Sequence, residues 1–201
     1  MKLGCSNLNL YRILLKQGKI MKKIIMLLSA LVLAGCSSSP YVYHVEPTQL
    51  QSNETQYDIS SVKVNLVLGH GAITGDDSFV NEAALKKQFE DALVVAMKEK
   101  GIYGKASGYS VVVDIDYKRT FNLGGKALNK PEVSHTVSII DAENKKLASF
   151  AAGKYTTSYG TFGNAAVNIQ IASFTWGAED ELKDVKVVAE VIVNQLADLG
   201  N

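Results

Sequence analysis

Alternating apolar and polar residues predict three β-strands in this chain, over residues 62–68, 109–117 and 133–140, and an apolar run predicts a fourth over residues 147–156. In the third of these, His135 shares the apolar side with valines and isoleucine, while serines and threonine occupy the other side. A short polar run at 141–146 separates the last two strands, which predicts that they form a hairpin. Polar residues on the outward positions are typical of an antiparallel sheet with one face packed against the core and the other partly exposed to solvent.

Apolar residues at helical spacing predict two helices, at about 81–100 and 179–199. Asn81 is suited to cap the first helix and Gly101 to end it in a left-handed conformation. The expected buried stripe of the second helix consists of Leu182, Val185, Val188, Ala189, Ile192, Leu196 and Leu199. Residues 165–176 fit either a strand or a helix, and we favour a helix.

The order of these elements is strand, helix, three strands, helix, which predicts an α+β fold. We expect an antiparallel or mixed sheet of about four or five strands with two or three helices packed on one face. Residues 62–201 form a single domain in this interpretation, and residues 36–61 form a flexible tether. As an alternative within the tether, Tyr41-Val42-Tyr43 could pair with the domain as an edge strand.

The N-terminal part of the chain has the layout of a cleavable export signal. Lys22 and Lys23 precede an apolar core of roughly ten residues, which is too short to span a membrane. The run ends at Leu33-Ala34-Gly35-Cys36. Residues 1–35 are therefore predicted to be a signal peptide, and because Met21 begins a complete signal, we favour Met21 as the true start.

The sequence Leu33-Ala34-Gly35-Cys36 resembles the lipobox of bacterial lipoproteins. The resemblance implies cleavage before Cys36, a diacylglycerol on its sulfur, and a fatty acyl chain such as palmitate on its new amino group. In Gram-negative lipoproteins an aspartate after the cysteine favours the inner membrane. Ser37 stands there in this chain, so the resemblance implies an anchor in the outer membrane with the domain facing the periplasm. The element order after the lipobox is similar to that of small outer-membrane lipoproteins of the YajG type.

Removal of the signal changes both the charge and the thiol content of the chain. Residues 1–35 contain six of the 21 Lys and Arg side chains and no acid, which leaves 15 basic against 20 acidic side chains, a net charge of −5. An acidic domain without clustered Lys and Arg argues against nucleic acid as a partner. Cys5 would be removed and Cys36 acylated, so disulfides, zinc held by cysteine and a thiol nucleophile are excluded if processing occurs.

His70, Asp76 and Asp77 form the first candidate site for chemistry. A histidine and two carboxylates in a glycine-rich loop could bind a divalent metal or act as an acid–base pair. We favour a plain strand-to-helix loop, because no further ligand follows at helical spacing. We expect no metal and no cofactor. The loop also lacks the spacing of a phosphate-binding P-loop.

Two other sets of titratable residues have structural interpretations that we prefer. His135 could serve as a pH switch, but a core histidine with a hydrogen-bond partner is favoured. Asp114 and Asp116 share one strand face and could act as paired carboxylates, but we expect both to face solvent.

Aromatic residues in the glycine-containing stretch 155–163 form a candidate interaction loop. Tyr155, Tyr159 and Phe162 could stack on a sugar ring or form a patch for a partner protein. We favour packing at a strand end followed by a flexible loop over either of these roles.

These observations favour a lipid-anchored envelope protein that acts by binding, as a non-catalytic accessory component. The expected partners are the membrane, through the acyl chains on Cys36, and an envelope protein or a glycan. A carrier of a small apolar ligand or lipid is the alternative. A hydrolase that uses His70 with Asp76 or Asp77 is the third hypothesis.

Overall fold

The computed structural model describes residues 41–47, 50, 55–73, 77–122 and 127–199. Within these ranges no helix combines the length and the apolar character needed to cross a membrane. The elements, in chain order, are β1 (Tyr41–Val45), β2 (Tyr57–Leu68), α2 (Glu82–Glu99), β3 (Tyr109–Arg119), β4 (Glu132–Ile140), β5 (Lys146–Thr156), α3 (Gly160–Ala172), the 3-10 turn η1 (Ala178–Asp180) and α4 (Glu181–Ala197).

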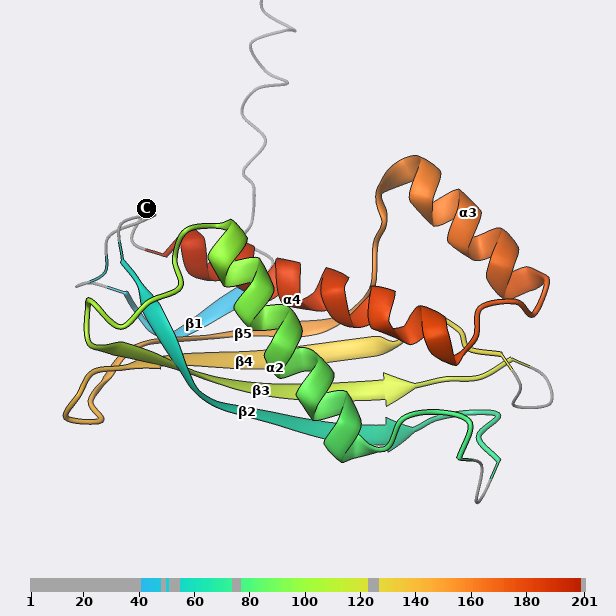
Figure 1. The fold of residues 1–201 in the computed structure, drawn as a ribbon, viewed down its shortest axis with the longest axis horizontal. Coiled ribbons are helices and arrows are strands. Elements are labelled where there is room, and N and C mark those ends of the chain that lie inside the picture. The colour runs from blue at the N-terminus through green and yellow to red at the C-terminus, as the bar shows by residue number, and fades with distance from the viewer. Residues whose placement is uncertain (1–40, 48–49, 51–54, 74–76, 123–126, 200–201) are drawn as a thin grey trace, which may run out of the picture. The chain divides into compact units, whose positions relative to one another are not determined.

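The five strands form one mixed sheet in the order β1-β5-β4-β3-β2, which confirms the predicted α+β fold (Figure 1). Strands β2 and β3 run parallel because α2 connects them, whereas the other neighbours are antiparallel. The expected hairpin of β4 and β5 is present. Its turn is held by Asp141, whose Oδ1 accepts hydrogen bonds from the backbone N–H groups of Glu143 and Lys145.

The core lies between one face of the sheet and helices α2 and α4. The largest buried side chains on α2 include Leu85, Phe89 and Leu93, and they lie in one cluster with Phe150 of β5 and Ile192 of α4. Each of these is at most 1% exposed. Burial of such side chains stabilises the fold by about 1.5–3 kcal/mol each, so this layer dominates the stability of the domain.

His135 belongs to this apolar face, as expected. It is 3% exposed, and its Nδ1 and Nε2 lie 2.9 Å from the Tyr155 hydroxyl and 2.8 Å from Gln195 Oε1. Because an amide oxygen only accepts, Nε2 carries the proton and the Tyr155 hydroxyl donates to Nδ1. Burial lowers the pKa of His135, and the bond to Gln195 only partly opposes this, so the ring is neutral.

Local capping explains the bounds of α2. Asn81 Oδ1 accepts a hydrogen bond of 2.9 Å from the Ala84 N–H, and Gly101 follows the helix at a φ of +74°. Glu82 has a further role, because its Oε2 accepts a hydrogen bond of 3.0 Å from the backbone N–H of Leu66 on edge strand β2. Glu82 in the first turn of α2 therefore occupies a backbone N–H of edge strand β2 that another strand would need in order to pair with it there.

The strands of the sheet begin before residue 62, the predicted start of the domain. The edge strand given as an alternative for Tyr41-Val42-Tyr43 is present as β1, and residues 57–61, which were expected to belong to the tether, are strand as well. Aromatic packing explains the first segment, since the rings of Tyr41 and Tyr43 lie 5.1 and 6.3 Å from that of Phe150. Burial explains the second, since Tyr57 is 1% exposed and its N–H donates to the carbonyl of Ile102.

Helices α3 and α4, in the C-terminal third of the chain, differ in part from the sequence predictions. The ambiguous segment is a helix, as favoured, but it begins at Gly160 and lies away from the sheet in Figure 1. Helix α4 buries the predicted stripe with one exception: Leu182 is 39% exposed and lies in a groove on the outer side of α2 and α4.

Candidate functional site

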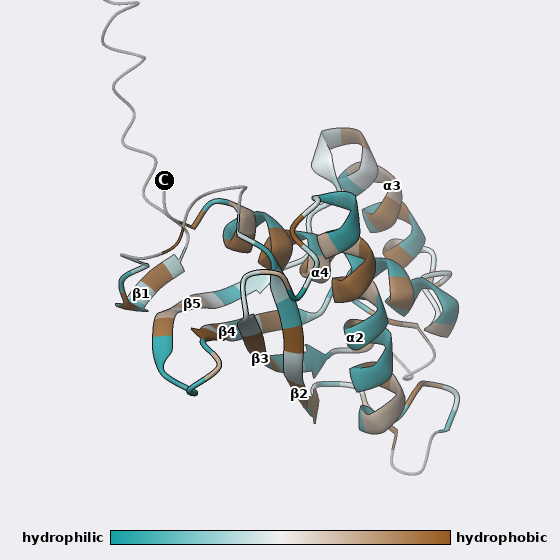
Figure 2. Cartoon of the chain, turned by 60° about the vertical axis from the view of Figure 1, so that its left-hand side comes forward, coloured by the Kyte–Doolittle hydropathy of each residue, from teal (hydrophilic) through white to brown (hydrophobic). Residues whose placement is uncertain are grey.

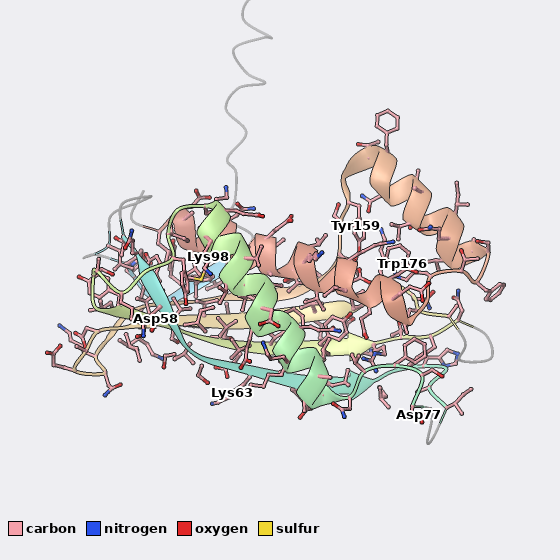
Figure 3. All side chains as sticks on the ribbon, viewed as in Figure 1. Asp58, Lys63, Asp77, Lys98, Tyr159 and Trp176 are labelled. Atoms are coloured by element: carbon pink, nitrogen blue, oxygen red, sulfur yellow. The ribbon has the colours of Figure 1, made fainter. Side chains whose placement is uncertain are left out.

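Both ends of helix α3 are fixed by one buried carboxylate, Asp184 of α4. Its Oδ1 accepts hydrogen bonds from Thr157 Oγ1 at 2.5 Å and from the Tyr159 hydroxyl at 2.6 Å, both just before α3. Its Oδ2 accepts one from Trp176 Nε1 at 3.2 Å, just after α3. Figure 3 shows Tyr159 and Trp176 between α3 and α4. We call these four side chains the Asp184 clamp.

The electrostatics of the clamp follow from its burial. Asp184 is 0% exposed, and burial raises its pKa although the hydrogen bonds from Thr157, Tyr159 and Trp176 act in the opposite direction. Burial and the bond to Asp184 together raise the pKa of the Tyr159 hydroxyl, so this hydroxyl stays a donor. Lys130 lies 5.7 Å from the Tyr159 ring centroid and adds a positive charge near the carboxylate.

A second buried ion pair fixes the start of α4 against the sheet. Arg119 at the end of β3 binds Glu181 in a bidentate manner, with Nε–Oε1 and Nη2–Oε2 distances of 2.7 and 2.8 Å. The same Nη2 donates to the carbonyl of Val80 at 2.8 Å, and the guanidinium lies 5.5 Å from the Phe79 ring. Burial raises the pKa of Glu181 despite the opposing effect of Arg119. The pair therefore sets the position from which Asp184 reaches its partners, one helical turn later.

The inner side of α3 packs on a small separate cluster. Val167 is 6% exposed and lies with Phe121, Leu128 and Trp176, while Ile171 packs against them at the edge. This cluster is distinct from the main core between the sheet and α2 and α4. Helix α3 is thus held at its two ends and along one narrow side.

The outer side of α3 exposes large apolar side chains. Phe162 and Ile169 are 91% and 68% exposed, and Phe174, just after the end of the helix, is 57% exposed. Figure 2 shows the hydrophobic colour on this helix, which lies at the periphery of the domain. Apolar side chains that gather on one exposed element are typical of an interaction site.

The predicted interaction residues 155, 159 and 162 separate in the structure. Tyr155 lies in β5 and its hydroxyl is hydrogen-bonded to His135, while the hydroxyl of Tyr159 donates to Asp184. Both tyrosines therefore contribute to holding the fold together. Phe162 is the most exposed of the three, at 91%, and it lies on a helix, so the expected glycine-supported loop was wrong at that position. The sequence reasoning missed Ile169 and Phe174. The signal that could have found them is the absence of any charged side chain over residues 155–178.

The positions of the described side chains do not support the predicted site at His70, Asp76 and Asp77. His70 and Asp77 are both exposed, and Asp76 lies outside the described residues. Among the residues that the structure describes, no group of three or more His, Cys, Asp or Glu side chains could hold a metal ion.

Asp114 and Asp116 lie on the uncovered face of the sheet and are exposed, as expected. Asp116 accepts a hydrogen bond of 2.9 Å from Asn65 Nδ2, and Asp114 lies 3.8 Å from Lys63 Nζ. They border a wide open groove of about 760 Å³, which Ser134 also lines. These side chains bond mainly to one another, which is typical of a solvated sheet face.

The lipobox residues 33–36, the sorting residue Ser37 and the signal peptide lie outside the described residues. Their roles stay predictions from the sequence.

Comparison with known proteins gives structural likeness only. No protein-family model and no curated protein matches the chain. Among solved structures, protein XCC0632 of family DUF330 from Xanthomonas campestris matches with a TM-score of 0.40 and 12% identity, over 79% of this chain and 93% of that one. A PelC dodecamer from Paraburkholderia phytofirmans matches with a TM-score of 0.30 and 10% identity, over 75% and 96%. A minor lipoprotein from Acinetobacter baumannii matches with a TM-score of 0.30 and 16% identity, over 70% and 92%.

Proposed function

We propose that this protein is a lipid-anchored envelope protein that acts by binding, as a non-catalytic accessory component at the periplasmic side of the outer membrane. The observation that carries the proposal is helix α3, an uncharged helix whose large apolar side chains face solvent. The chain fixes this helix at both ends by a buried carboxylate, so the exposed side chains are presented on a rigid element.

The buried acid of the Asp184 clamp fits this structural role better than a catalytic one. Both oxygens of Asp184 already accept hydrogen bonds, and the side chain is 0% exposed. A general acid or base must reach a substrate within about 3 Å. The carboxylate oxygens of Asp184 instead accept hydrogen bonds from Thr157, Tyr159 and Trp176.

The space between the sheet and helices also favours binding at the surface over transport of an apolar ligand. A carrier requires an enclosed cavity, whereas Phe89, Phe150 and Ile192 fill the layer between the sheet and the helices with side chains at 0% exposure. The apolar grooves along the helices, of about 470 and 420 Å³, open at the surface instead.

The anchor part of the proposal rests on the sequence. Acyl chains on Cys36 would hold the protein at the membrane stably, because two or more chains suffice for this. Ser37 supports the outer membrane as the destination. The expected partner is an envelope protein, with a glycan as the alternative.

Membrane fractionation of Gram-negative cells that express the full chain tests the anchor. We expect the parent chain in the outer membrane, the Cys36→Ala variant out of the lipid-anchored fraction, and the Ser37→Asp variant in the inner membrane. The Ser39→Asp variant is the matched control and is expected to behave like the parent. Unchanged fractionation of the Cys36→Ala variant would refute lipid anchoring.

Crosslinking in intact cells tests the binding role. Reproducible capture of an envelope component by the parent chain, reduced by Phe162→Ser, supports it. Repeated absence of any crosslinked species, in cells where the anchored protein is abundant, would count decisively against it.

A further inference from the structure

The outward side of α3 carries a regular apolar stripe. Phe162, Ala165, Ile169 and Ala172 are all exposed and recur at spacings of three, four and three residues. At roughly 100° per residue, this stripe lies on the opposite side of the helix from buried Val167. The spacing is that of the a and d positions at which two helices pack together. We call these four residues the α3 stripe.

A further exposed apolar side chain follows the end of α3, and its backbone has a strained, left-handed conformation. Phe174 has a φ of +60°, and its N–H donates to the carbonyl of Ile171 at 3.1 Å. The Thr175 N–H donates to the carbonyl of Gln170 at 2.9 Å, which completes a Schellman motif. Glycine is the usual residue at the left-handed position, and a side chain there costs about 1–2 kcal/mol. Phe174 is 57% exposed, so more than half of this apolar residue faces solvent in a strained conformation at the end of α3.

Charge selects the kind of partner that fits the stripe. The chain from Cys36 onward has 15 basic and 20 acidic side chains, so two copies carry the same net charge and repel each other overall. Residues 155–178 contain no charged side chain. Two copies can therefore meet at α3 without bringing like charges together and without burying an unpaired charge.

The stripe is also complementary to itself. Two antiparallel α3 helices related by a two-fold axis near residue 167 place residue 162 of each copy beside residue 172 of the other. The same axis places residue 165 beside residue 169. Large Phe162 and Ile169 then oppose small Ala172 and Ala165, as interdigitating helices require.

We propose that α3 is a self-association surface that pairs with α3 of a second copy of this chain. The inference rests on the proposed binding role of α3 and names its partner. The exposed parts of Phe162 and Ile169, the two large residues of the α3 stripe, amount to about 300 Å² per copy, or about 600 Å² in all, which is below the standard interface size. The pair is therefore weak in dilute solution, and confinement of the copies to one membrane raises their effective concentration.

Site-specific photo-crosslinking of the full chain in intact cells tests the pairing. A Phe162→p-benzoylphenylalanine variant is expected to give a crosslinked species of twice the mass that contains two differently tagged copies. The same crosslinker at Glu143, an exposed residue of the β4–β5 turn, is the control and is expected to give none. A species that contains another protein overturns the self-association but leaves the binding role standing. The absence of any species at position 162 overturns both.

A charge exchange tests the antiparallel register. Ile169→Glu and Ala165→Lys place like charges near the two-fold axis, and each alone is expected to reduce the crosslinked homodimer about tenfold, equivalent to 1.4 kcal/mol. Co-expression of the two variants brings opposite charges together and is expected to restore a mixed dimer to about the parent level. Both residues are exposed, and unchanged Trp176 fluorescence would show that the fold is intact. If the yield of the crosslinked mixed dimer does not recover while the fold is intact, the register and the pairing are refuted.

Discussion

Removal of the Asp184 carboxylate is expected to release α3 from the domain. In the Asp184→Ala variant, Thr157 and Trp176, which are 2% and 1% exposed, lose their acceptor and have no access to water. Each buried donor left unpaired costs about 1–3 kcal/mol. Half-buried Tyr159 adds less because its hydroxyl can turn to solvent. Relief of the buried charge offsets part of the loss.

We therefore expect the free energy of unfolding to fall by about 3 kcal/mol, equivalent to about 10 °C in Tm for a domain of this size. The Asp184→Asn variant keeps one acceptor oxygen and is expected to lose about half as much. Its amide nitrogen, however, must face one of the three donors.

Trp176 makes the assay specific, because it is the single tryptophan of the chain and its indole N–H is bonded to Asp184. Urea unfolding is followed by Trp emission and by far-ultraviolet circular dichroism. In the Asp184→Ala variant, the emission is expected to shift to the red and to become quenchable before the helical signal is lost. Asp91→Ala is the matched control, since Asp91 is an exposed acid on α2 and its pair with Lys87 contributes about 0.3–0.5 kcal/mol.

The reasoning about the clamp would be refuted by one clear result. If Asp184→Ala lost less than about 1 kcal/mol and left the Trp176 emission unchanged, the three hydrogen bonds would not be what fixes α3.

Three other predictions follow from the same geometry. Phe174→Gly relieves about 1–2 kcal/mol of left-handed strain but loses the buried part of a ring that is 57% exposed, so the free energy of unfolding is expected to change by less than about 1 kcal/mol, as measured by urea unfolding. Arg119→Met alone is expected to cost about 3–5 kcal/mol because it leaves Glu181 buried and unpaired, whereas the double variant Arg119→Met with Glu181→Leu is expected to recover most of that loss. The pKa of His135 is lower in the folded protein, so the stability due to its neutral ring is full above about pH 6.5 and is lost as the pH falls toward the folded pKa; the Tm of His135→Gln should depend less on pH in that range.

The periodicity of the sequence determined the elements of the main core. The strands at 109–119 and 132–140 follow from local alternation, and the strand at 146–156 follows from an apolar run after a polar turn. Helix α2 follows from helical spacing and the Asn81 and Gly101 caps. These signals are local, because each depends on residues within one or two turns of each other. The parallel pairing of β2 with β3 is not local, so the pattern left an antiparallel or a mixed sheet open.

The candidate site depended on contacts that are distant in sequence. Nothing near Asp184 distinguishes it from the other acids at the start of a helix, where a negative charge is generally favourable. Only the fold brings Thr157 and Tyr159 to it from 25 or more residues away, and so converts Tyr159 from a predicted contact residue into a structural one. Exposure of Phe162 and Ile169 was equally undetermined, because apolar residues at helical spacing indicate a buried side but not which side is buried. The sequence determined the predicted anchor at Cys36 and the sheet with its covering helices, and the tertiary structure decided that α3 faces outward.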